Sequence, residues 1–95
     1  MSLTLCCLLW ARPGMNAALA DYEDRVLALI PEHGATVVSR VQSDGADGHP
    51  VEVQVFEFAS QHSLDAYLGD ERRTALTAER DAAVARTELF PVTVA

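Results

Sequence analysis

The spacing of apolar positions changes several times along the chain, and each change marks an expected element. Leu3 to Trp10 is a nearly continuous apolar run, which is typical of a strand covered on both faces. From about Asn16 the apolar residues recur at three- and four-residue intervals, which predicts an amphipathic helix. Its stripe comprises Leu19, Tyr22, Val26, Leu29 and Ile30.

The ends of this helix carry recognisable signals. Asn16 has a side chain suited to an N-cap, and Gly34 suits the position just after the last turn. Pro31 lacks a backbone donor and crowds the preceding turn. We therefore expect the regular helix to end or kink near Leu29.

Two alternating runs follow, Ala35 to Gln42 and Val51 to Phe58, and each predicts a strand. The segment between them, Ser43 to Pro50, contains two Asp-Gly steps and predicts a hairpin loop.

The last third of the chain predicts helices and a final strand. Ser60 is suited to cap a short helix that runs through Leu68, and Asp70 to cap a further helix that reaches about Arg86. Glu88 to Val94 is the expected last strand, and the proline within it indicates an edge position.

The resulting order is strand, helix, strand, strand, helix, strand. This order predicts an α+β ferredoxin-like fold, βαββαβ, that occupies residues 1–95 as one domain. Right-handed crossovers place the helices on one face of a four-stranded antiparallel sheet. The other face is left uncovered by this chain.

The expected third strand has two different faces. The set Val51, Val53, Val55 and Glu57 is expected to pack under the helices, and the set Glu52, Gln54, Phe56 and Phe58 to lie on the open face. A hairpin register that brings Arg40 near Gln54 and Gln42 near Glu52 aligns the polar side chains. The first strand is apolar on both faces apart from Thr4. A second copy of the chain is therefore the expected cover of the open face.

Charge and composition exclude several classes of function. The chain has 7 Arg, no Lys and 14 acidic residues, for a formal charge of −7. Such a charge disfavours binding to nucleic acids or to anionic membranes. Without lysine, neither Schiff-base chemistry nor a P-loop is available.

Two features of the N-terminal run, its cysteines and its length, indicate the cellular compartment of the protein. Cys6 and Cys7 are adjacent and point to opposite faces of a strand, so a disulfide scaffold is excluded. The run is too short to span a bilayer, and no basic side chain precedes Arg12 as a signal peptide requires. We expect a cytoplasmic protein with reduced thiols.

A short set of motifs resembles a known superfamily. The chain reads Glu57-Phe58-Ala59-Ser60 at the end of the third strand, followed by Ala66-Tyr67, Asp70-Glu71-Arg72 and Arg80, with Tyr22 and His33-Gly34 upstream. In this pattern it resembles the dimeric α/β-barrel superfamily, and most closely a small bacterial family of uncharacterised domains within it. Ala59 stands where proline is usual, and His33 where a second glycine is common.

The resemblance implies a homodimer with a cleft between sheet and helices. The superfamily includes cofactor-free monooxygenases of antibiotic biosynthesis, lactone isomerases, haem-degrading enzymes and stress-related proteins, so it implies no single reaction.

Few side chains are candidates for chemistry. Glu57, at the end of the valine set, is the candidate general base, and a structural ion pair with an arginine is its alternative role. Trp10, Tyr22 and Tyr67, together with Arg40, are candidates for lining a pocket, although such aromatics also serve as plain core. The histidines show no metal-ligand spacing, so we expect no metal and no cofactor.

Three functions remain open. The first is binding of a small apolar or aromatic molecule in the cleft by a homodimer. The second is a cofactor-independent monooxygenase or isomerase acting on an aromatic or polyketide-like substrate. The third is a self-associating module without a ligand. The sequence does not decide whether the protein is an enzyme.

Overall fold

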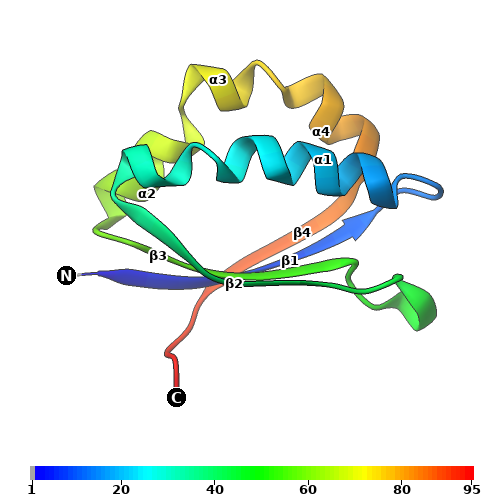
Figure 1. Cartoon of the computed structure of the whole chain (residues 1–95), viewed down its shortest axis with the longest axis horizontal. Helices are drawn as coiled ribbons and strands as arrows, with labels where there is room; N and C mark the ends of the chain where they lie inside the picture. The colour runs from blue at the N-terminus through cyan, green and yellow to red at the C-terminus, as the bar shows by residue number, and fades with distance from the viewer. Residues whose placement is uncertain (1) are drawn as a thin grey trace.

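The computed structural model describes residues 2–95 and has the expected ferredoxin-like architecture (Figure 1). The sheet is four-stranded, with the order β2-β3-β1-β4. Its strands are β1 (Leu3–Ala11), β2 (Ala35–Gln42), β3 (Glu52–Phe58) and β4 (Val84–Pro91). The helices are α1 (Asn16–Leu27), α2 (Gln61–Leu68), α3 (Glu71–Thr74) and α4 (Thr77–Ala83), with short 3₁₀ turns η1 (Ile30–His33) and η2 (Ala46–Gly48).

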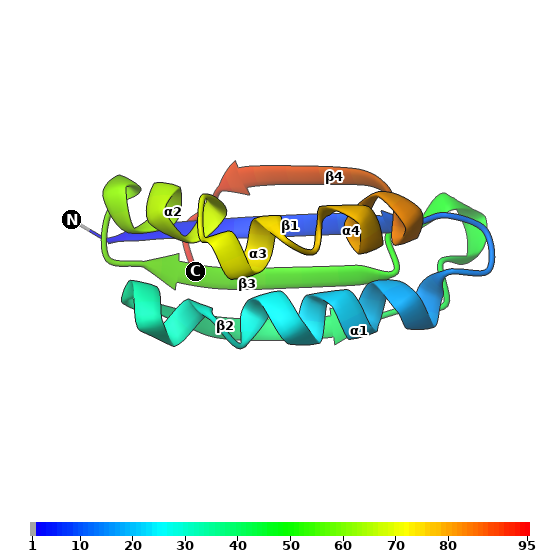
Figure 2. The same ribbon diagram turned by 90° about the horizontal axis from the view of Figure 1, so that it is seen from above.

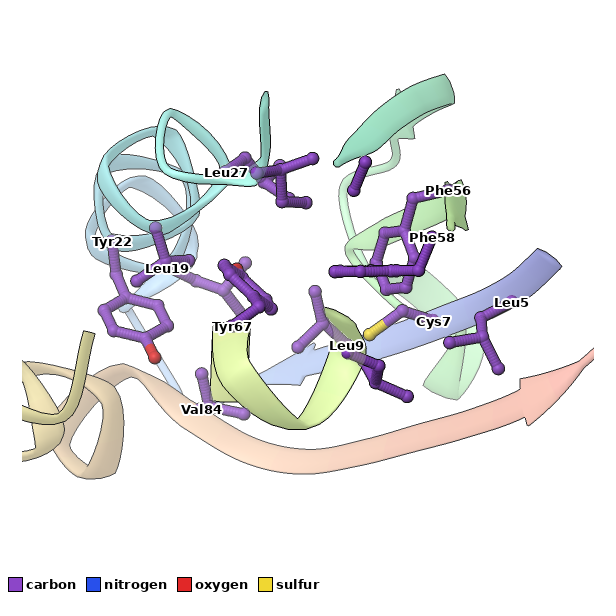
Figure 3. Packing of buried hydrophobic residues seen from close by; sticks show 14 of the residues in the cluster. Leu5, Cys7, Leu9, Leu19, Tyr22, Leu27, Phe56, Phe58, Tyr67 and Val84 are labelled. Atoms are coloured by element: carbon purple, nitrogen blue, oxygen red, sulfur yellow. The ribbon is translucent and has the colours of Figure 1, made fainter. Parts of the chain in front are cut away.

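All helices lie on one face of the sheet; on the other side, residues 2–95 contribute no helix or strand, and only the C-terminal segment projects from it (Figure 1). Viewed from above, α1 runs along the β2 side, and the segment α2–α3–α4 runs above β1 between α1 and β4 (Figure 2). The core lies between these two layers. Its largest side chains come from β1, β3, α1 and α2, among them Leu9, Tyr22, Phe58 and Tyr67 (Figure 3).

Several local signals act as the sequence predicts. Ser60 accepts a hydrogen bond from the backbone of Ser63 and caps α2, and Asp70 accepts one from Arg72 and caps α3. Gly34 has φ of 66° at the end of η1, a left-handed conformation that favours glycine. The regular part of α1 ends at Leu27, shortly before the proline-containing turn.

Three expected boundaries are wrong. Asn16 is the first residue of α1 and not its cap, because Met15 occupies the N-cap position; the side-chain amide of Asn16 donates to the carbonyl of Asp44 in the hairpin loop. The helix expected to reach Arg86 is split into α3 and α4 and ends at Ala83. β4 begins at Val84 because β1 continues to Ala11 and offers it a pairing partner there. The strand therefore spans Val84–Pro91 and not the expected Glu88 to Val94.

The expected faces of β3 are also wrong. Glu52, Gln54, Phe56 and Phe58 are buried under the helices, whereas Val53, Val55 and Glu57 lie on the open face. Val51, which directly precedes β3, is the one member of the expected inward set that is buried in the core. The register with β1 explains the exchange of faces, since Leu5 pairs with Phe56 and Leu9 pairs with Glu52. Paired residues share a face. Two phenylalanines also remove more apolar area from water than two valines would.

Candidate functional site

A cavity of about 390 Å³ lies between the sheet and the helices. Its walls come from β1, β3 and β4 below and from α1, α2 and the α3–α4 segment above. The lining side chains are Cys7, Leu9, Glu23, Gln54, Phe56, Leu64, Tyr67, Leu68, Arg73, Thr77, Arg80, Thr87 and Leu89. Leu68, Thr77 and Leu89 are exposed, so the cavity opens to solvent between β4 and the helical segment above it.

The inner wall of the cavity holds a buried polar network. The Gln54 side-chain amide donates to Glu23 Oε1 at 2.7 Å and to Glu52 Oε1 at 2.8 Å. Arg40 donates to Glu52 and, at 2.5 Å, to Asp24 of α1. Glu52 also lines a second, smaller cavity of about 230 Å³ beside α1. Gln54 thus connects a carboxyl group in the large cavity with one at the small cavity.

Glu23 is the carboxyl group of the large cavity and is only 6% exposed. Burial raises its pKa, the Gln54 hydrogen bond lowers it, and the nearby Glu52 carboxylate raises it further; the net shift is upward. A buried carboxyl group with a raised pKa is a candidate general acid or base.

Cys7 also lines the cavity, but its thiol is poorly suited to act as a nucleophile. Burial raises the pKa of its thiol to about 12. The thiol therefore stays protonated at physiological pH and is a poor nucleophile.

Two guanidinium groups line the cavity from its helical side. Arg73 lies with its guanidinium carbon 5.1 Å from the centre of the Tyr67 ring. Arg80 donates to the hydroxyl of Thr87 at 3.2 Å. Burial raises the pKa of Tyr67 to about 12, although a side-chain hydrogen bond with Arg73 and the positive charge of Arg73 both lower it. Tyr67 is therefore a neutral phenol at physiological pH.

The candidate base from sequence lies elsewhere. Glu57 is exposed on the open face of β3, opposite Thr4 and Thr36 in the neighbouring strands. The expectation that its carboxylate is partly buried is wrong, because the two phenylalanines of β3 take the helix side.

The other candidates lie in three different places. Tyr67 lines the cavity, whereas Tyr22 is packed in the core and is 1% exposed. Arg40 lies beneath α1, on the far side of Gln54 from the cavity, where Glu52 and Asp24 bind it. Trp10 lies on the open face, where Arg86 stacks on its ring at 4.4 Å.

Sequence reasoning missed Glu23, Gln54 and Arg73 as site residues. The signal for Gln54 was present, because it alternates with Phe56 and Phe58 along β3. Glu23 follows Tyr22 on the buried stripe of α1 and widens that stripe toward the sheet. No motif in the sequence distinguishes Arg73 from its neighbour Arg72.

Two further features concern residues 2–95 as a whole. This part of the chain has no group of three or more His, Cys, Asp or Glu side chains placed to hold a metal ion. None of its helices combines the length and the apolar character needed to cross a bilayer.

Fold and cavity together define a small ferredoxin-like α+β protein with a partly apolar cavity between sheet and helices. No family model matches the sequence, and no curated protein matches it. Solved structures match closely in fold. A DABB family protein with a ferredoxin-like fold from Mesorhizobium loti has a TM-score of 0.70 at 13% identity, over 99% of this chain and 97% of that one.

Two other solved structures have different names but the same fold. A protein from Bacteroides thetaiotaomicron, classed by its name among the antibiotic biosynthesis monooxygenases, has a TM-score of 0.77 at 12% identity and covers 98% of this chain and 89% of its own. A dimeric protein of unknown function from Bacteroides fragilis has a TM-score of 0.72 at 8% identity, over 98% and 96%. At these identities the likeness shows the ferredoxin-like fold.

Proposed function

We propose that this protein binds a small, largely apolar or aromatic molecule in the cavity between sheet and helices. The cavity itself is the observation that carries the proposal. Its volume of about 390 Å³ lies in the range of ligand sites, which are mostly apolar with a few convergent polar groups. Leu9, Phe56 and Leu64 supply the apolar walls, and Glu23 and Arg73 supply polar groups.

We propose further that the protein works as a homodimer whose copies meet through the open sheet face. Alternation along the strands places Cys6 and Leu8 of β1, Val53 and Val55 of β3 and Phe90 of β4 on that face. Phe90 is 41% exposed in the single chain, and an apolar sheet face of this kind is a typical interface. A second copy would cover it symmetrically.

Native mass spectrometry of freshly purified protein tests both proposals, because it reports subunit count and bound mass together. Leu89 and Phe90 provide a matched pair: each is 41% exposed, and they are adjacent on β4. Leu89 lines the cavity, and Phe90 lies on the opposite face. Leu89→Trp should fill the cavity, whereas Phe90→Trp should alter only the proposed interface.

We expect the unchanged protein to be a dimer with additional bound mass. Leu89→Trp should lose that mass and stay dimeric, and Phe90→Trp should keep it. A dimer that neither carries mass nor gains any from a library of apolar small molecules would support a self-associating module without a ligand. A monomer at micromolar concentration would contradict the proposed interface.

A second candidate function is a cofactor-independent isomerase or monooxygenase acting on an aromatic or polyketide-like substrate. The observation that favours it is Glu23, a buried carboxyl group with a raised pKa in the cavity wall. The role of general base then falls to Glu23 and not to Glu57. Glu23→Gln should abolish turnover of such a substrate without loss of binding, and full activity in this variant would exclude Glu23 as the base.

A further inference from the structure

Arg73 differs from Arg80, the other arginine that lines the cavity. Its Nε is buried and has no hydrogen-bond partner in residues 2–95. A buried donor without a partner costs about 1–3 kcal/mol, and more when the group is charged, so such atoms are rare in folded proteins. The Nε itself is closed to solvent, but Arg73 lines the cavity, so a bound molecule there can offer its guanidinium group an acceptor.

The remaining arginines show that acceptors are otherwise plentiful in this acidic chain. Arg40 binds Glu52 and Asp24, and Arg72 binds Asp70 and Glu32. Arg73 follows Arg72 directly but forms no salt bridge with any described carboxylate. The guanidinium group of Arg73 therefore contacts the Tyr67 side chain and has no carboxylate partner among the described residues.

The charge balance of the cavity favours an anion. Arg73 and Arg80 both line it, and Arg80 has only the Thr87 hydroxyl and a distant Asp81 carboxylate, 3.9 Å away, as partners. Glu23 is the only carboxyl group among the lining residues. Its burial favours the neutral form, and Gln54 already occupies one of its oxygens. Two cationic groups thus face a carboxyl group that resists ionisation.

We propose that the ligand carries an anionic oxygen group, a carboxylate or an enolate, which binds Arg73, with Arg80 as the second donor. Its apolar body packs against Leu9, Phe56 and Leu64. This inference rests on the proposed ligand-binding function and narrows it to acidic apolar molecules. Guanidinium groups suit such oxygens because their planar donors bind two acceptors at once.

Two fluorescent probes that share one aromatic body test the inference. 8-Anilinonaphthalene-1-sulfonate carries a negative charge, and N-phenyl-1-naphthylamine lacks it. The unchanged protein should bind the charged probe at least about tenfold more tightly, as one charge-assisted hydrogen bond provides. Arg73→Gln should weaken binding of the charged probe about tenfold and leave binding of the uncharged probe unchanged. Arg73→Lys, which keeps the charge, should lose less.

Arg86→Gln is the matched control, because it removes the same charge from the open sheet face. It should leave the affinity for both probes unchanged, whereas Leu89→Trp should prevent both probes from binding. If Arg73→Gln affects both probes equally or neither of them, the inference is wrong while the cavity remains a ligand site. If Leu89→Trp displaces neither probe, or neither binds at all, the proposed function itself fails.

Discussion

At the scale of single residues, the three buried polar side chains Glu23, Glu52 and Gln54 form one hydrogen-bonded group. Gln54 is 1% exposed and uses both amide hydrogens, one on Glu23 and one on Glu52. The sequence allowed the pairing of Arg40 with Gln54 and of Gln42 with Glu52 to be predicted, and the register of β2 and β3 confirms it. The face on which these side chains lie was predicted wrongly, because the valines were ranked above the phenylalanines as core.

The raised pKa of Glu23 predicts a specific dependence of stability on pH. In the folded protein this carboxyl group holds its proton to higher pH than in the unfolded chain, where its pKa is about 4.3. The folded state binds more protons in that window, so stability falls as pH rises from about 4.3 to the raised folded value. Glu23→Gln removes the ionisable group and with it this loss of stability. The oxygen of the new amide can still accept a hydrogen bond from Gln54.

Thermal unfolding across pH measures the difference. Glu23→Gln should melt a few degrees higher than the unchanged protein at pH 8, and the two curves should converge below about pH 4. Asp70 has its pKa held well below the usual range by Arg72 and His33, so acid destabilises both proteins alike through that group. A Glu23→Gln curve that lies below the unchanged protein at pH 8 would contradict a buried, raised carboxyl group.

At the scale of elements, the helix signals of the second half of the chain were readable, but the helix lengths were not. Ser60 and Asp70 cap α2 and α3 as predicted. The break between α3 and α4 and the early start of β4 were missed. The Ala-rich segment has good intrinsic helix propensity throughout, and pairing with β1 takes over at Val84. Tertiary pairing of this kind leaves no local mark in the sequence.

The cap of α2 links helix stability to the cavity, because this helix carries Leu64, Tyr67 and Leu68 into the lining. Ser60→Ala removes the acceptor for the backbone of Ser63 and should lower the free energy of unfolding by about 1 kcal/mol. Ser60→Asn restores an acceptor and should recover most of it. Urea denaturation measures both variants, and equal losses for Ala and Asn would show that the cap contributes nothing.

At the scale of the whole molecule, the structure has one covered face and one bare face. The overall topology was predictable because the order of elements and the right-handed crossover rule leave few alternatives. The cavity was not, because its volume depends on how α2, α3 and α4 lie across β1 and β4. Its polar residues come from β3, β4, α1 and the successive helices α2, α3 and α4, and no spacing in the sequence connects them.

The bare face leads to a prediction about assembly. Val55 lies on that face in β3, a central strand, so Val55→Glu would place a charge inside the proposed interface. We expect the dimer dissociation constant to rise at least about a hundredfold, since an unpaired buried charge costs several kcal/mol. Ala78→Glu, an exposed change on α4, is the control. Light scattering across a concentration series decides, and an unaltered Val55→Glu dimer would contradict the interface.

Trp10 allows the bare face of the sheet to be observed by spectroscopy separately from the cavity side. It is the chain's single tryptophan, and it is held on the bare face by Arg86 and by a 2.8 Å hydrogen bond to the carbonyl of Gly48. Its emission therefore reports the solvent exposure of that face. Tyr67, packed beside Phe58 in the cavity wall, and Tyr22 in the core lie on the other side and together supply its tyrosine signal. Dilution of a dimer should shift the tryptophan emission to longer wavelength, and filling the cavity should leave it in place. Assembly and ligand occupancy can thus be followed in one sample without any label.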